Sequence, residues 1–204
     1  MHLLDQRILG IAILFLLGMM VTVKRIATGS VLDKPKGNLT IRLVNIFNLF
    51  FLLMVNPLAA ILLILRCMGT IDPTHMSIDK SGMLAVLEIA GMALYASGFL
   101  LMAGALIALG RNYQLGGSAP RSEDQMIKAG PYRLIRHPMY TAALSISLGL
   151  TCLIQSWASF GVFCLYLVLI LLLIPVEEAG LRNAYGEAFL AYLRITKKII
   201  PHVY

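Results

Sequence analysis

The sequence predicts an all-α, polytopic membrane protein with about five transmembrane helices and a carboxyl-terminal cytoplasmic amphipathic helix. The chain of 204 residues is 59% hydrophobic and only 13% charged, and its mean hydropathy is +0.82, which lies outside the range of ordinary soluble proteins. Its apolar residues gather in segments near the ~20 residues that a helix needs to cross a bilayer. Its basic residues gather in alternate connecting segments, as in multi-pass membrane proteins.

Five apolar segments follow one another, and we expect each to form a membrane helix. Lys24 and Arg25 directly follow the first segment, a pattern typical of a retained anchor rather than of a cleaved signal peptide. The first and fourth segments are short for a full span, and residues 155–157 predict a tight turn between the fourth and the fifth. The five segments are residues 8–23, 43–65, 83–109, 139–154 and 157–176.

We interpret residues 1–204 as a single membrane domain, because no linker, low-complexity tract or internal repeat divides the sequence. Residues 1–110 supply three helices, and residues 111–204 supply a long loop, a helical hairpin and a tail. In the fourth segment, Thr141, Ser145 and Gly149 recur every four residues, which favours close approach of another helix. Such a small face also makes room for a cofactor or lipid chain, and both interpretations stay open.

The distribution of basic residues predicts an outside amino terminus and a cytoplasmic carboxyl terminus, by the positive-inside rule. Only Arg7, Arg66 and Lys80 fall on the opposite side. The net charge of +7 therefore indicates topology and attraction to anionic lipid headgroups, and nucleic acid is excluded as a partner because the chain has no soluble basic domain. The residues on the cytoplasmic side are Lys24, Arg25, Lys34, Lys36, Arg42, Arg111, Arg121, Lys128, Arg133, Arg136, Arg182, Arg194, Lys197 and Lys198.

Cysteine and histidine residues are too dispersed to predict a disulfide framework, a zinc site or any other metal site. We interpret the cysteines as small apolar packing residues. The residues concerned are Cys67, Cys152, Cys164, His2, His75, His137 and His202.

Polar residues inside the apolar segments need partners. We expect Glu88, just inside the third segment, to be exposed at the outer interface. Asn45, Asn48 and Asn56 in the second segment are expected to form interhelical hydrogen bonds rather than to touch substrate.

After the fifth segment, an amphipathic cytoplasmic helix is expected. Pro175 precedes Glu177 and Glu178, and apolar residues then recur at spacings of three and four. Gly186 within this helix weakens it by about 1 kcal/mol relative to alanine, so the helix is expected to break there. The apolar positions are Leu181, Tyr185, Phe189, Tyr192 and Leu193.

Residues 130–140 form a polar cluster where membrane meets water. Arg133, Arg136, His137 and Tyr140 gather at the start of the fourth apolar segment. Because charged groups beside a lipid-embedded helix are costly, such clusters usually bind a charged ligand. The sequence therefore predicts an active site at the membrane surface.

Several motifs of the carboxyl-terminal half occur together: Gly130-Pro131-Tyr132, Arg136-His137-Pro138, Tyr140, Gly149, Glu177-Glu178, Leu181, Tyr185-Gly186, Phe189 and Tyr192. In this combination they resemble the isoprenylcysteine carboxyl methyltransferase and phospholipid methyltransferase superfamily. The segment Leu109-Gly110-x-Asn112-Tyr113 also resembles an element of that superfamily, with tyrosine in place of tryptophan. The first two apolar segments match the superfamily only in being apolar.

The resemblance implies an integral membrane methyltransferase that uses S-adenosylmethionine at a cytoplasmic pocket formed by the last helices, the preceding loop and the tail. Methyl transfer is an in-line displacement, so the protein has to align the acceptor, bind the cofactor and exclude water. Candidate acceptors are amphiphiles such as an isoprenylcysteine carboxylate or a phospholipid amine. The short chain favours a prokaryotic cytoplasmic membrane.

The resemblance also assigns roles to residues. Arg136, His137 and Glu177 are the catalytic candidates, and Arg136 with His137 is expected to hold a cofactor carboxylate or an anionic substrate group. The cofactor-binding candidates are Tyr132, His137, Tyr140, Glu177 and Glu178.

Simpler interpretations remain open for the same residues. Arg133 and Arg136 could simply anchor the helix to lipid phosphates. His137 could be only the residue that precedes a proline in the first turn of a helix. Glu177 and Glu178 could form the solvated start of a helix.

Two rival functions also remain. A sterol reductase that uses a nicotinamide cofactor shares an Arg-His-Pro-x-Tyr element. A membrane subunit without catalytic activity keeps the fold alone.

Overall fold

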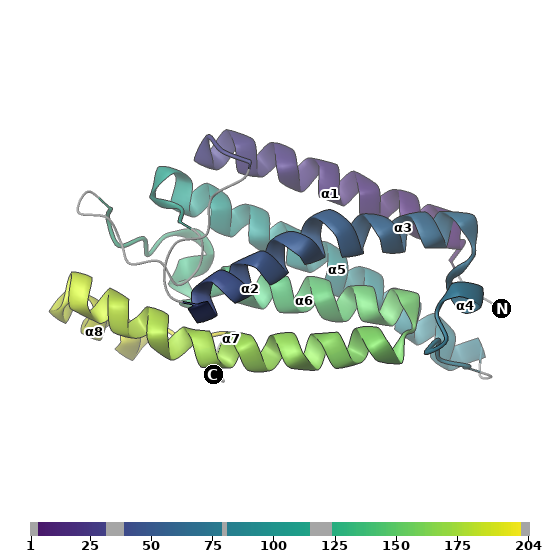
Figure 1. Ribbon diagram of the computed structural model, residues 1–204. Coiled ribbons are helices and arrows are strands. Elements are labelled where there is room, and N and C mark those ends of the chain that lie inside the picture. The colour runs from purple at the N-terminus through teal and green to yellow at the C-terminus, as the bar shows by residue number, and fades with distance from the viewer. Residues whose placement is uncertain (1–3, 32–38, 79–80, 115–123, 201–204) are drawn as a thin grey trace.

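The computed structural model describes residues 4–31, 39–78, 81–114 and 124–200, and these ranges fold into helices with two isolated bridges. Figure 1 shows the long helices as an antiparallel bundle. The predictions for His2, Lys34, Lys36, Lys80, Arg121 and His202 lie outside the described residues. The helices are α1 (Gln6–Thr28), α2 (Leu39–Phe50), η1 (Phe51–Val55), α3 (Asn56–Leu65), α4 (Met68–Ile71), α5 (Ser81–Leu109), η2 (Gly110–Asn112), η3 (Gly130–Arg133), α6 (Pro138–Ile154), α7 (Trp157–Tyr185) and α8 (Glu187–Ile195).

Every apolar segment predicted from the sequence forms a helix. Within the described residues, four helical stretches are long and apolar enough to cross a membrane: Gln6–Thr28, Ile41–Leu65, Gly82–Asn112 and Trp157–Tyr185. Helix α6 is apolar but has only 17 residues, in line with the short fourth segment. Most α6 residues are buried, and Figure 1 shows α6 among the other long helices. The chain is an integral membrane protein whose short fourth apolar segment forms a helix inside the bundle.

Helices α5 and α6 approach closely because glycines face each other along their contact. A Cβ atom added to Gly149 would lie 2.7 Å from the Gly91 carbonyl oxygen, and one added to Gly98 would lie 2.9 Å from that of Ala142. The small face of the fourth apolar segment therefore packs against a helix at Gly149, as the first of its two interpretations predicted.

The turn between α6 and α7 also follows the prediction. Gln155 adopts a left-handed conformation with φ 53°, and the Ser156 side chain caps α7 by accepting a hydrogen bond from the Ser159 amide. A tight helical hairpin results.

The segment after Pro175 differs from the prediction. Helix α7 continues through Pro175 to Tyr185 and ends at Gly186, where φ is +52°. Glu177 and Glu178 therefore lie inside a helix, and their interpretation as a solvated helix start is wrong. Gly186 does break the helix as predicted, and the short α8 beyond it buries Phe189 and Tyr192.

Glu88 is not exposed, contrary to the prediction. Its exposed fraction is 1%, and its Oε2 atom accepts a hydrogen bond of 3.0 Å from the Leu4 amide. The interhelical hydrogen bonds predicted for the asparagines are present at two positions, and the expectation that these residues do not touch substrate stays a prediction. The Tyr95 hydroxyl donates to Asn56 Oδ1 across 2.7 Å, and the Tyr166 hydroxyl donates to Asn48 Oδ1. The second span is thus joined to α5 and to α7.

Candidate active site

The predicted polar cluster lies where the start of α6 meets a segment close to the carboxyl terminus. The Arg136 amide donates to the Lys197 carbonyl across 2.8 Å, and the His137 amide donates to the Lys198 carbonyl across 3.0 Å. The Thr141 hydroxyl donates to the Ile199 carbonyl across 2.8 Å. Residues 196–199 are irregular apart from one isolated bridge between Lys197 and Ile135, and we call them the tail strand. They hold the backbone that carries the cluster.

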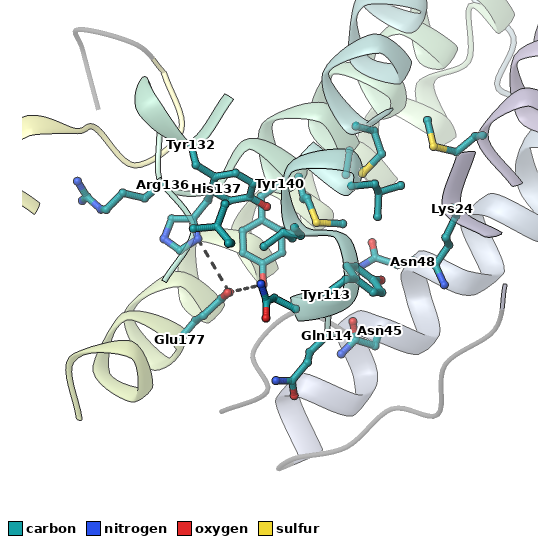
Figure 2. Close-up of a pocket in the computed structure, with 18 of the residues that line it drawn as sticks. Lys24, Asn45, Asn48, Tyr113, Gln114, Tyr132, Arg136, His137, Tyr140 and Glu177 are labelled. Atoms are coloured by element: carbon teal, nitrogen blue, oxygen red, sulfur yellow. Dashed lines mark hydrogen bonds and ion pairs between the residues drawn. The ribbon is translucent and has the colours of Figure 1, made fainter. Parts of the chain in front are cut away.

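Glu178 joins Arg136 to His137. Its Oε1 atom accepts from Arg136 Nε at 2.8 Å and lies 3.2 Å from His137 Nε2. The Arg136 guanidinium also donates to the Thr196 carbonyl, and in Figure 2 its side chain points away from Tyr140 and Glu177. Arg136 is thus bound to a carboxylate of α7 and to the Thr196 carbonyl, and the role predicted for it in holding a ligand anion stays a prediction.

Glu177 faces the opposite side of the His137 ring. Its Oε2 atom accepts from the Tyr140 hydroxyl at 2.5 Å and lies 4.0 Å from His137 Nδ1, as the dashed lines in Figure 2 show. The His137 and Tyr140 rings stack with their centroids 5.5 Å apart. The two glutamates, adjacent in sequence, therefore bracket one imidazole ring.

A cavity of about 340 Å³ opens beside this cluster. Tyr132, Arg136, His137, Tyr140 and Glu177 line it, whereas Glu178 is not among its lining residues. The structure therefore separates two carboxylates that the sequence left equivalent. Glu177 faces the cavity, and Glu178 lies behind His137, where it holds the ring and Arg136.

Helix α8 closes one side of the cavity. Phe189 and Tyr192 line the cavity, and the Tyr192 hydroxyl donates to the Tyr132 carbonyl across 2.5 Å. Burial raises the pKa of Tyr192 to about 12, so this hydroxyl keeps its proton at neutral pH. The donor that fixes the Tyr132 backbone is thus present throughout the physiological range.

The cavity continues from this polar end into the membrane-spanning part of the bundle. Its apolar wall comes from η1, α5 and α6, and Figure 2 shows side chains of this wall beside the labelled polar residues. Cofactor-sized ligands bind in cavities of about this size that combine apolar walls with a few polar groups. The apolar residues of this wall include Phe51, Leu52, Leu53, Phe99, Met102, Leu106 and Ile146, and Leu49 of α2 and Met20 and Val21 of α1 line the cavity beside them.

Sequence reasoning missed several residues of the cavity. Lys24, interpreted only as a topology signal, lines it, donates to the Val31 carbonyl across 2.9 Å and lies 5.1 Å from the Tyr113 ring centroid. Asn45 and Asn48 also line it. The available signal was their spacing of three residues within an apolar span, which places both on one helix face.

Other sequence-predicted residues lie apart from the cavity. Arg133 is exposed, and its predicted contact with lipid phosphate stays a prediction. The three cysteines have no disulfide partner, and among the described residues no group of three or more His, Cys, Asp or Glu side chains could hold a metal ion.

Comparison with known proteins identifies a similar fold and a family. A solved structure, the eukaryotic intramembrane Ras methyltransferase ICMT (isoprenylcysteine carboxyl methyltransferase), is similar in fold, with a TM-score of 0.52 and 16% identity over 92% of this chain and 74% of that chain. No curated protein matches the sequence. The model of the phospholipid methyltransferase family matches residues 86–188, which are just over half of the 204 residues and contain most of α5 and all of α6 and α7. The chain therefore belongs to the phospholipid methyltransferase family and is an integral membrane methyltransferase.

Proposed function

We propose that this protein transfers a methyl group from S-adenosylmethionine to an amphiphile whose reactive head reaches the polar end of the cavity and whose hydrocarbon chain lies against the apolar wall. The family implies S-adenosylmethionine as the methyl donor. The observation that carries the proposal is the continuity of one cavity from Glu177 and His137 to Phe99 and Leu106. A soluble acceptor would not need an apolar wall at membrane depth.

The polar end of the cavity fits the cofactor's chemistry. When bound, S-adenosylmethionine supplies an electrophilic methyl carbon on a sulfonium, together with an ammonium, a carboxylate and ribose hydroxyls. We assign the ammonium or a ribose hydroxyl to the Glu177 carboxylate, which faces the cavity and is oriented by Tyr140. We assign the carboxylate to His137 and Tyr132. Alignment and exclusion of water are the protein's main contributions to such a displacement.

Arg136 and Glu178 act in this proposal as positioning residues. Glu178 accepts hydrogen bonds from Arg136 and approaches His137 Nε2, so it fixes the ring that faces the cavity. Arg136 joins Glu178 to the tail strand through Thr196. This assignment departs from the sequence-based hypothesis that both residues touch the ligand directly, because Glu178 does not line the cavity and the guanidinium of Arg136, which does line it, is bound to Glu178 and Thr196.

The class of the acceptor head distinguishes two versions of the proposal. A carboxylate acceptor is already nucleophilic at neutral pH, whereas an ammonium acceptor must first lose a proton, for which Glu177 is the candidate base. A rate that rises with the deprotonation of the amine would identify an aminolipid. A rate that is flat above the carboxylate's pKa would identify a carboxylate.

We further propose that the site faces the cytoplasm of a prokaryotic cell and that the amino terminus of α1 lies outside. The support is the position of Lys24, Arg111, Arg136 and Arg194, which belong to elements that meet at one end of the bundle in Figure 1. The amino-terminal end of α1 lies at the other end. Labelling of a single cysteine placed at Gln6 or at Glu187 with a membrane-impermeant maleimide tests this orientation, because only the Gln6 position should react in intact cells.

Calorimetric titration of the purified protein with S-adenosylhomocysteine tests the cofactor assignment. We expect one saturable site, weakened about tenfold or more by His137→Ala and by Glu177→Ala, because each loses a charge-assisted contact. Arg133→Ala is the matched control, since this arginine is exposed and does not line the cavity. Saturable binding of NADPH in place of S-adenosylhomocysteine would support the reductase, and binding of neither ligand would support the subunit without catalytic activity.

A further inference from the structure

The second membrane span contains a π-turn. Residues Phe51–Val55 form the π-helix η1 between α2 and α3, and the Asn56 amide donates to the Phe51 carbonyl across this wider turn. Turns of this kind are rare and recur at functional sites. In the hydrocarbon region of a membrane, the backbone groups of such a turn need protein partners, because no water is present to replace them.

Asn56 supplies such a partner. Its side chain is fully buried, and its Nδ2 atom donates a second hydrogen bond, of 2.7 Å, to the Phe51 carbonyl. Its Oδ1 atom accepts from the Tyr95 hydroxyl, also at 2.7 Å. One amide side chain therefore closes the π-turn and ties it to α5.

Tyr95 is itself fixed by the helix that carries the active-site residues. A Cβ atom added to Gly149 of α6 would lie 2.6 Å from the Tyr95 amide nitrogen, so the two backbones are in direct contact. The Tyr95 ring packs on Phe99 with the ring centroids 4.9 Å apart, and Phe99 lines the cavity. The contact between Tyr95 and α6 thus positions the π-turn relative to α6, the helix that carries Tyr140.

The flanks of the π-turn are held differently. On its carboxyl-terminal side, α3 packs on α1 so closely that a Cβ atom added to Gly10 would lie 2.5 Å from the Ala60 carbonyl oxygen. On its amino-terminal side, α2 contacts α7 through the hydrogen bond from Tyr166 to Asn48. The Phe47 and Tyr166 rings also pack together, with their centroids 4.9 Å apart. The turn therefore lies between a closely packed helix and one that contacts its neighbour through long side chains.

The π-turn presents Phe51, Leu52 and Leu53 to the cavity. We infer that the π-turn, held by Asn56 and Tyr95, sets the length and bulk of the acceptor's hydrocarbon chain, because it fixes the apolar wall against which that chain lies. This inference rests on the proposed function. Asn56 and Tyr95 are then specificity-determining residues: Asn56 lines the cavity itself, whereas Tyr95 acts on the chain through the wall.

A purely structural role for the Asn56–Tyr95 hydrogen bond makes a different prediction. It would lower stability when the bond is removed and leave chain selectivity unchanged. Selectivity among chain lengths at constant cofactor affinity is therefore the discriminating measurement. It also separates this inference from the proposed function, because chain binding can be measured without methyl transfer.

The experiment measures displacement of the fluorescent fatty acid cis-parinarate from the detergent-purified protein by saturated fatty acids from octanoate to stearate. A parallel series of alkylamines, with the same lengths, separates the effect of the chain from that of the head. The variants are Tyr95→Phe, Asn56→Leu and deletion of Met54. Met54 faces lipid with 59% of its surface exposed, and its deletion converts the π-turn into an α-turn. Thr151→Val is the control, since Thr151 is buried and its hydroxyl hydrogen-bonds to Ser147 of α6 and to Ser159 of α7, but it does not line the cavity.

We expect the wild-type protein and the control to share one optimal chain length in both series. In the three variants the optimum should move, or the preference between neighbouring lengths should fall by about fourfold, the value of one methylene group in contact with the wall. Affinity for S-adenosylhomocysteine should stay within about twofold of wild type, because the polar end of the cavity is unchanged. Unchanged length profiles in all three variants, or a wild-type protein without an optimum, would overturn the inference.

A second test covers variants that fail to fold. Leu52→Trp adds bulk to the wall and leaves the Asn56–Tyr95 hydrogen bond in place. We expect its optimum to move to shorter chains in both series. An unchanged optimum in this folded variant would contradict the inference, whatever the protein's affinity for S-adenosylhomocysteine.

Discussion

Helices α5 and α6 and the α2–η1 segment all border the cavity, but they are held in place by different means. The α5–α6 contact is one of backbone on backbone at Gly91, Gly98 and Gly149, which leaves no room for adjustment. The α2–η1 segment is joined to its neighbours through side chains such as Asn48 and Tyr166. The family match begins at residue 86 and so includes most of α5 and all of α6 but none of α2 or η1. The comparison teaches that α5 and α6 are held by contact between their backbones, whereas the α2–η1 part of the apolar wall is held by contacts between side chains.

The largest effect is expected from filling the α5–α6 contact. In Gly149→Leu, the new side chain would begin 2.6 Å from the Tyr95 amide nitrogen and 2.7 Å from the Gly91 carbonyl oxygen. Because backbone atoms cannot rotate away, the cost should reach or exceed the upper end of the roughly 1–3 kcal/mol that overpacking usually causes. The yield of monodisperse protein and its thermal unfolding midpoint measure this.

Gly161→Leu in α7 is the matched control for that substitution, since nothing lies within 4 Å of a Cβ atom added there. It should fold like the wild-type protein. If Gly149→Leu were as stable as Gly161→Leu, the conclusion that the α5–α6 contact has no room for adjustment would be wrong.

The next largest effect is expected from removing the tail strand. A chain that stops after Ile195 loses the acceptors of the Arg136 and His137 amides and the Thr196 carbonyl that binds the Arg136 guanidinium. With about 1 kcal/mol lost for each of these hydrogen bonds, affinity for S-adenosylhomocysteine should fall more than tenfold. Calorimetric titration measures the affinity. Thr141→Val removes one hydrogen bond to the tail strand and should lower the affinity only a few-fold. Equal losses of affinity in the truncated chain and in Thr141→Val would contradict the conclusion that the hydrogen bonds of the tail strand act together.

A smaller effect is expected at Glu178. Glu178→Gln keeps the shape of the side chain but removes the charge that faces Arg136 and His137, so the His137 ring should lose its fixed orientation. We expect methyl transfer at saturating cofactor to fall about tenfold, the effect of roughly 1.4 kcal/mol in the transition state. Glu177→Gln should raise the apparent KM for S-adenosylmethionine more than Glu178→Gln does, because Glu177 lines the cavity. A larger rise in KM for Glu178→Gln than for Glu177→Gln would assign the contact with the cofactor to Glu178 and the positioning role to Glu177.

The smallest effect is expected where α2 contacts α7 through side chains. Tyr166→Phe removes the hydrogen bond to Asn48, and interhelical hydrogen bonds in membranes contribute about 0.6 kcal/mol on average. The unfolding midpoint should therefore change little, while the KM for the acceptor rises and that for S-adenosylmethionine does not. A large loss of stability would show that α2 is held as firmly as α6.

Much of this architecture could be predicted because apolar runs specify membrane helices directly. The positions of all five apolar helices, the turn at residues 155–157 and the break at Gly186 follow from local sequence. Pro175 misled the prediction, because the loss of one backbone donor does not end a helix whose flanking turns pack well. Local sequence does not report that packing.

The candidate site was predictable in membership but not in geometry. The cluster from Arg136 to Tyr140 and the pair Glu177–Glu178 were identified, but nothing local distinguishes two adjacent glutamates. They point to different sides of His137 because successive residues of a helix are about 100° apart around its axis. Burial of Glu88 likewise depends on the Leu4 amide, 84 positions away.

The contact between Arg136 and Thr196 joins residues 60 positions apart, and it has a consequence for the order in which the protein is made. Helix α6 is synthesised well before the tail strand that fixes the backbone of Arg136 and His137. A nascent chain with α6 already inserted in the membrane therefore lacks the geometry of the site. Ligand-binding geometry is acquired only after residues 196–199 have left the ribosome and returned to the start of α6, which separates membrane insertion in time from competence for methyl transfer.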